Sequence, residues 1–137
     1  MIGIVVITHG KLSEELKETA RLIMGDQNDF HTVTFTARES LDALRAKARE
    51  AIDRFRDSGC LVLTDVLGGS ATNVCVELLQ EDWIRVITGV NLPMVMEALQ
   101  NRQTLDLPNL SHKVRDGAAR AIIDLKEFYQ QRMKKKA

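Results

Sequence analysis

Cysteine, excess charge and long apolar runs are all scarce in this sequence, and each scarcity excludes a class of protein. Cys60 and Cys75 are the two cysteines, and they lie in apolar segments without CxxC spacing. We therefore expect buried free thiols instead of a disulfide or a metal site. Nineteen basic residues offset nineteen acidic ones, which predicts no general attraction to nucleic acid or to an anionic membrane. No apolar stretch approaches the roughly 20 residues needed to span a bilayer, and residues 1–7 lack the basic start of a signal peptide.

The composition predicts a single soluble domain that covers residues 1–137. Hydrophobic residues make up 45% and charged residues 28%, an ordinary globular balance. Two reduced thiols suit the cytoplasm, where disulfides are rare, so we expect a cytoplasmic location. Neither a G-x-x-x-x-G-K-S/T loop nor a G-x-G-x-x-G fingerprint occurs, so we expect no nucleotide cofactor.

Apolar segments of strand length alternate with amphipathic segments of helical period along the chain. The predicted strands are residues 2–7, 31–35, 60–63 and 84–88. The predicted helices lie at residues 12–23, at 41–55, around 74–78, from 91 onward, and as one continuous helix at 110–128. Alternation of this kind implies parallel pairing through right-handed crossovers. We therefore predict an α/β fold with a doubly wound, mainly parallel sheet of four strands and helices on both faces.

The ends of several predicted helices carry sequence signals. Ser13 precedes two glutamates at the start of the first helix, and Gly25 is placed to end it. Ser40 is a predicted N-cap of the second helix. Asn91, with proline two residues later, predicts another helix start.

Three turns follow apolar predicted strands, at residues 8–10, 65–70 and 89–91. In doubly wound sheets, ligands bind at the carboxyl ends of the strands, near the point where strand order reverses. Because parallel strands end at the same edge, we expect these three turns to face one site.

His9 directly follows the first predicted strand. It could be a nucleophile, a general base or a ligand, or it could cap the next helix or fill a gap. A neutral imidazole is a competent nitrogen nucleophile near pH 7. It acts best when a carboxylate holds one ring nitrogen as N–H and leaves the other lone pair free.

Asp65 follows the third predicted strand and is the candidate for that carboxylate. Alone, an aspartate at this place is more often a turn or cap residue. Two such residues at strand ends of one edge favour a His9–Asp65 pair.

Gly68, Gly69 and Ser70 form the third candidate element. Two glycines let the backbone approach an anion, and we expect Ser70 to cap the helix that follows. A tight turn that needs positive φ is the simpler alternative.

No second histidine, cysteine cluster or carboxylate pair completes a metal site in the sequence, so we expect none. His31 lies at the start of a predicted strand and His112 on a predicted helix. We expect both to be structural or surface residues.

Together the three turns resemble the IIA component of the mannose family of the bacterial phosphoenolpyruvate-dependent sugar phosphotransferase system (PTS). The matching segments are IVVITHG at 4–10, DVLGGSATN at 65–73 and TGVNLPM at 88–94. The resemblance implies a phosphotransferase component in which His9 is phosphorylated, Asp65 orients its ring, and the region of Gly69 and Ser70 holds the phosphoryl oxygens. It also implies transfer from the phosphocarrier HPr to a IIB protein, in sugar uptake or regulation.

The same resemblance implies a homodimer that exchanges a fifth, antiparallel edge strand. That strand would lie around residues 121–125, where the periodicity alone predicts helix. The family usually has proline where this chain has Ala71, and alanine is compatible with a first helical turn. The 137 residues contain no IIB domain, so we expect the acceptor to be a separate protein.

Two other classes of protein share this general fold. A receiver-like signalling domain needs acidic residues after the first strand, where this chain has Thr8, His9 and Gly10. The phosphotransferase subunit of dihydroxyacetone kinases also uses a histidine. It usually lacks the double glycine, so the mannose family is favoured.

Overall fold

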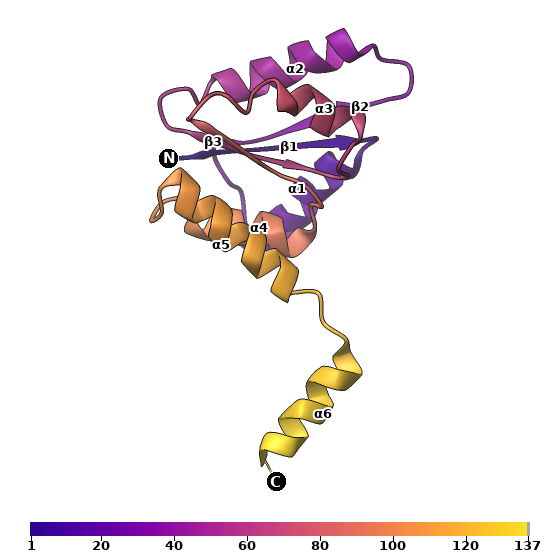
Figure 1. The fold of residues 1–137 in the computed structure, drawn as a ribbon, viewed down its shortest axis with the longest axis vertical. Helices are drawn as coiled ribbons and strands as arrows, with labels where there is room; N and C mark the ends of the chain where they lie inside the picture. Colours follow the sequence, from indigo (N-terminus) through magenta and orange to yellow (C-terminus); the bar gives the residue numbers. More distant parts are fainter. Residues whose placement is uncertain (137) are drawn as a thin grey trace.

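The computed structural model describes residues 1–136, in which a four-stranded parallel sheet is combined with helices on both faces (Figure 1). The strands are β1 (Gly3–His9), β2 (Phe30–Phe35), β3 (Cys60–Thr64) and β4 (Ile84–Ile87). The helices are α1 (Leu12–Met24), α2 (Leu41–Asp53), α3 (Ser70–Val76), α4 (Leu92–Asn101), α5 (Leu107–Arg120) and α6 (Leu125–Lys136). The strand order is β2-β1-β3-β4, so the predicted α/β class and doubly wound sheet are confirmed.

Strand order places the reversal point between β1 and β3. The chain goes from β1 to β2 on one side and then crosses to β3 on the other. Register pairs Ile7 with Thr64, so His9, two residues further along β1, and Asp65, the first residue after β3, lie at the same edge of the sheet. His9 and Asp65 therefore emerge side by side at the place where doubly wound folds bind ligands.

Two apolar cores cover the two faces of the sheet. Along β1, Ile4 and Val6 pack with the helices α1, α4 and α5, whereas Val5 and Ile7 pack with α2 and α3. Figure 1 shows α2 and α3 on one side of the sheet and α1, α4 and α5 on the other. Burial on both faces explains the unbroken apolar sequence of β1. Cys60 and Cys75 are buried free thiols in the second core, as predicted.

Three of the four predicted helix-end signals are confirmed. Gly25 ends α1 with φ of 83°. The side chain of Ser40 accepts a hydrogen bond from the N–H of Ala43, and that of Asn91 accepts one from the N–H of Met94. Ser13 does not cap α1. Its own N–H donates to Thr8 Oγ1 at 2.8 Å, and its buried hydroxyl donates to the carbonyl of Val33. The β1 threonine therefore takes over the capping role predicted for Ser13.

The predicted single helix at residues 110–128 is wrong. Helix α5 ends at Arg120, residues 122–124 have no regular structure, and α6 begins at Leu125 and extends away from the domain (Figure 1). Asp124 starts α6 by accepting the N–H of Glu127 at 3.1 Å, which is the aspartate-x-x-glutamate signal of a new helix. Periodicity missed the break because the apolar positions of α5 and α6 are in phase. None of the described helices is long and apolar enough to cross a membrane.

Candidate active site

The carboxyl ends of β1 and β3 bring His9 and Asp65 into direct contact. His9 Nδ1 lies 2.8 Å from Asp65 Oδ2, and the backbone N–H of His9 donates to the same oxygen at 2.9 Å. The other carboxylate oxygen, Oδ1, accepts the N–H of Val66 at 2.8 Å. The predicted pair is thus formed, and three contacts fix the carboxylate.

The electrostatics of the pair keep Asp65 ionised. Burial raises the pKa of the Asp65 carboxyl, but hydrogen bonds from the His9 backbone, the His9 ring and Val66 outweigh it and hold that pKa below its usual value. An ionised carboxylate only accepts hydrogen bonds, so the neutral His9 ring carries its proton on Nδ1. The Nε2 lone pair is then free, on a side chain that is 44% exposed.

Phe35 holds another side of the imidazole. Its ring meets the His9 ring edge-on, with centroids 5.7 Å apart and planes at 74°. The register pairs Phe35 with His9, and the Gly10 N–H donates to the Phe35 carbonyl at 2.8 Å. The sequence analysis missed this residue. The one sequence feature that could have identified Phe35 is its place as the last residue of β2, the strand that pairs with β1.

The β3–α3 turn (residues 65–69) approaches His9 with its backbone. A Cβ atom on Gly69 would lie 2.9 Å from His9 Cε1 and 3.0 Å from Val66 Cγ2, so any side chain there would displace the imidazole or the turn. Gly68 has φ of 83°, which completes the turn and favours glycine. The sequence therefore needs both glycines, for two different reasons.

Ser70 does not cap α3, contrary to the prediction. The N-cap is Gly69, and Ser70 is the first residue of the helix, followed by the buried Ala71. Alanine is therefore accommodated in the first turn, as expected. The hydroxyl that organises this region belongs to Thr72, which the sequence analysis did not select: it donates to Val66 O at 2.7 Å and lies 3.0 Å from Gly69 O.

The β4–α4 turn (residues 88–91) supports the end of β3. The N–H of Gly89 donates to the Asp65 carbonyl at 2.7 Å, and the N–H of Val90 donates to the Thr64 carbonyl at 2.9 Å. These bonds fix the backbone of Asp65. All three predicted turns therefore meet at one edge, and they differ in what they contribute.

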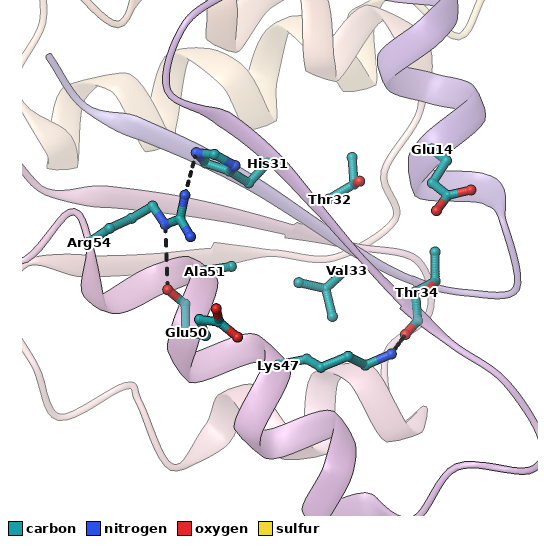
Figure 2. Close-up of a pocket in the computed structure, with 9 residues that line it drawn as sticks. All are labelled: Glu14, His31, Thr32, Val33, Thr34, Lys47, Glu50, Ala51 and Arg54. Carbon is teal, nitrogen blue, oxygen red and sulfur yellow. Dashed lines mark hydrogen bonds between the residues drawn. The ribbon is translucent and has the colours of Figure 1, made fainter.

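The other two histidines lie apart from this pair. His31 lines a hollow of about 260 Å³ between β2 and α2, where its Nε2 atom lies 3.3 Å from Arg54 and its ring contacts Phe55 (Figure 2). Burial, followed by the charges of Arg54 and Lys17, lowers the pKa of His31 below the usual histidine value. His112 is exposed on α5. These surroundings fit the structural and surface roles expected for the two residues.

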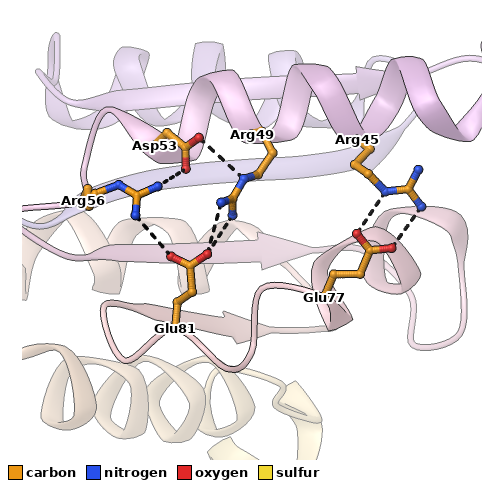
Figure 3. A network of polar contacts seen from close by, with 6 residues as sticks. All are labelled: Arg45, Arg49, Asp53, Arg56, Glu77 and Glu81. Carbon is orange, nitrogen blue, oxygen red and sulfur yellow. Dashed lines mark hydrogen bonds and ion pairs between the residues drawn. The ribbon is translucent and has the colours of Figure 1, made fainter.

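Ion pairs connect the segment after α3 to α2. Arg45 Nε donates to Glu77 at 3.0 Å, and Arg49 Nη1 donates to Glu81 at 3.1 Å (Figure 3). Arg56 also reaches Glu81, so two arginines share one carboxylate. Each exposed ion pair contributes little to stability alone, but together the pairs link the segment after α3 to α2 at several points. Within residues 1–136, no group of three or more metal-binding side chains gathers.

Comparisons with known proteins identify the family of the chain and agree with its fold. The family model EIIA-man, described as PTS system fructose IIA component, matches residues 3–115. The chain is similar to the fructose-specific PTS EIIA component of Bacillus subtilis, with 31% identity over 84% of this chain and 80% of that protein. It is 30% identical to the sorbose-specific EIIA component of Lacticaseibacillus casei over 78% of each chain. The solved EIIA component from Streptococcus agalactiae aligns with a TM-score of 0.87 and 30% identity, over 93% of this chain and 99% of that one. The chain belongs to the EIIA-man family of PTS IIA components.

Proposed function

We propose that His9 carries a phosphoryl group on Nε2, taking it from phosphorylated HPr and passing it to a IIB protein. The observation that carries this proposal is the His9–Asp65 contact of 2.8 Å, which fixes Nδ1 as the protonated nitrogen and leaves Nε2 as the nucleophile. Asp65 is the residue that orients the ring. We place this activity in the cytoplasm, in sugar uptake or its regulation.

The transfer balances without water or a metal ion. The Nε2 lone pair forms a bond to phosphorus while the bond from phosphorus to the donor breaks, and that electron pair stays on the donor. The proton on Nδ1 remains in its hydrogen bond to Asp65 throughout. Phosphorylation at Nε2 makes the imidazole ring more electron-poor, and the adjacent carboxylate stabilises it. Passing the group to the acceptor reverses the same steps.

Residues 68–70 are proposed to hold the phosphoryl oxygens. Gly69 has no side chain beside His9 Cε1, the ring atom next to Nε2, so its backbone can lie close to a group on that nitrogen. Ser70 is the first residue of α3, where a helical N–H has no intrahelical acceptor. Its hydroxyl is a second donor at the same place, and the positive φ of Gly68 shapes the turn.

The surroundings of His9 suit protein partners. Leu12, at the start of α1, and Val66 and Leu67, in the β3–α3 turn, are exposed apolar side chains, and Leu67 is 85% exposed. An apolar rim around an exposed nucleophile favours docking of another protein over binding of a small sugar. The donor and the acceptor must then bind in turn, since both need the same nitrogen.

A homodimer is part of this proposal. Ile122 and Ile123 are exposed in the segment that links α5 to α6, and β4 is an edge strand of the sheet. Residues 122–124 can add to the β4 of a partner as the antiparallel fifth strand, which would pair that edge and cover both isoleucines. Multi-angle light scattering tests this: the full chain should be a dimer, and a chain ending at Arg120 a monomer. A monomeric full chain would refute the exchange.

Phosphorylation is tested with phosphoenolpyruvate, enzyme I and HPr, followed by intact mass measurement. The full chain should gain the mass of one phosphoryl group, and acid should remove it. His9→Ala should abolish the gain, whereas His112→Ala, which changes an exposed histidine on α5, should keep it. No gain in the full chain with active HPr would refute the proposal.

A further inference from the structure

The turn that contacts His9 is closed by a side chain that lies outside the turn. Val66, Leu67, Gly68 and Gly69 form a tight turn with the positive-φ glycine third, the arrangement of a type II turn. The turn's own hydrogen bond, from Gly69 N–H to Val66 O, is long at 3.3 Å. The Thr72 hydroxyl lies 2.7 Å from the same carbonyl and is therefore the shorter and stronger of its two contacts.

Thr72 is well placed for this contact because α3 fixes it. Its side chain is buried, and its Oγ1 also lies 3.0 Å from the carbonyl of Gly69, one helical turn earlier. One hydroxyl hydrogen is thus shared between the first and last carbonyls of the turn. The Asn73 N–H bonds to the Gly69 carbonyl at 3.0 Å, so the start of α3 and the end of the turn form one unit.

Two of the groups that contact the His9 ring, Asp65 and Gly69, depend on that unit. Asp65 Oδ1 accepts the N–H of Val66, the residue whose carbonyl Thr72 binds. Gly69, the other residue whose carbonyl lies beside the Thr72 hydroxyl, packs against His9 Cε1. Loss of the hydroxyl would leave the turn with its single long bond, and both contacts with the ring would loosen.

We propose that Thr72 is a positioning residue of this site, and that its hydroxyl holds residues 66–69 so that Asp65 and Gly69 contact the His9 ring. The effect on phosphoryl transfer rests on the function proposed above, whereas the effect on the ring does not. Thr72 itself touches neither His9 nor a phosphoryl group. It acts through the carbonyls of Val66 and Gly69.

The test compares Thr72→Val, which keeps the branched shape and removes the hydroxyl, with Thr72→Ser, which keeps the hydroxyl. Thr64→Val is the matched control, because it makes the same change at a buried threonine whose hydroxyl has no partner among the described residues. Two quantities are measured in the full chain: the tautomer of His9 by nitrogen-15 NMR, and the single-turnover rate of transfer from saturating phosphorylated HPr.

We expect wild type, Thr72→Ser and Thr64→Val to keep the Nδ1–H form and the wild-type rate. Thr72→Val should show a mixture of tautomers and a rate at least roughly 10-fold lower, because small misplacements of reacting groups are costly. A normal tautomer and rate in Thr72→Val would overturn the proposal, and so would an equal loss in Thr64→Val or no rescue by serine. If HPr does not phosphorylate the wild type, the proposed function fails, and the tautomer still decides the role of Thr72.

Discussion

The β3–α3 turn and the β4–α4 turn follow neighbouring strands, and each contains a glycine with positive φ, yet their contacts with the site differ. The first, through Asp65 and Gly69, contacts the His9 ring directly. The second contacts no part of the ring in the described structure, and its Gly89 N–H instead binds the carbonyl of Asp65. A residue's position at the carboxyl edge of a sheet therefore predicts that it lies near the site, and its hydrogen bonds decide whether it acts or supports.

The glycines of the two turns make the same distinction. Gly69 has an ordinary φ of −77° and is needed for the space beside His9 Cε1. Gly89 has φ of 77° and open space around its Cα, so it is needed for its backbone conformation. Substitutions in the first turn should therefore change chemistry, and those in the second should change stability.

Asp65→Asn should have the largest effect. The asparagine amide can donate as well as accept a hydrogen bond, so it can pair with either tautomer of the His9 ring. The Nδ1–H form, which leaves the Nε2 lone pair free, would then no longer be fixed. Transfer from phosphorylated HPr should slow by about 10²–10⁴-fold, by analogy with loss of the orienting aspartate in other histidine sites. Rapid-quench kinetics measures the rate, and circular dichroism checks that the fold is intact. A wild-type rate in a folded variant would remove Asp65 from the mechanism.

Gly69→Ala should come next. The added methyl would lie 2.9 Å from His9 Cε1, so the ring or the turn must move, although the backbone conformation suits alanine. We expect transfer to slow by roughly 10–100-fold, because the reacting nitrogen is displaced. Single-turnover kinetics measures the loss, and thermal melting should show little change. A variant with normal kinetics and a strongly lowered melting temperature would contradict the assignment of this turn to the site.

Gly89→Ala should show the opposite pattern. Nothing lies within 4 Å of the added methyl, but a non-glycine residue at φ of 77° is strained by about 1–2 kcal/mol. The free energy of unfolding in urea should fall by that amount, while the transfer rate measured well below the melting temperature stays at the wild-type value. A loss of rate without a loss of stability would mean that the β4–α4 turn takes part in the chemistry.

Of the two turns, low pH should act on the β3–α3 turn alone. The pKa of Asp65 is depressed in the folded chain, so its ionised form stabilises the fold above the unfolded pKa of about 3.9, and this contribution is lost as pH falls through the folded value. The difference in unfolding free energy between wild type and Asp65→Asn should therefore shrink as pH falls below about 4. The difference between wild type and Gly89→Ala should stay constant. Equal pH dependence of the two differences would refute this assignment.

Local sequence patterns predicted most of the fold because they report burial and hydrogen bonding directly. The apolar runs identified all four strands, and Gly25, Ser40 and Asn91 marked helix ends correctly. The α5–α6 break was missed because two helices in phase give the same periodicity as one. Its signal, Asp124 three residues before Glu127, was present in the sequence.

In the site, the sequence predicted only the residues that lie at strand ends or in the turns directly after them. His9 ends β1 and Asp65 follows β3, and the two strands proved to be adjacent, so the contact followed from topology. Phe35 and Thr72 were missed because their contacts depend on register and on the path of a turn, which no local pattern encodes. The error at Ser70 has the same origin: Thr72, two residues on, bonds the turn, and Gly69 occupies the cap position.

Thr64→Val should have the smallest effect, and it should be stabilising. Thr64 lies at the end of β3, directly before the first turn, and its buried Oγ1 has no hydrogen-bond partner among the described residues. An unpaired buried hydroxyl costs free energy, so valine should raise the unfolding free energy by about 1 kcal/mol. Urea denaturation with an unchanged slope measures the gain, and Thr72→Val, which loses a formed bond, should shift the midpoint in the opposite direction. Destabilisation by Thr64→Val would mean that this hydroxyl has a partner after all, and that it too belongs to the support of Asp65.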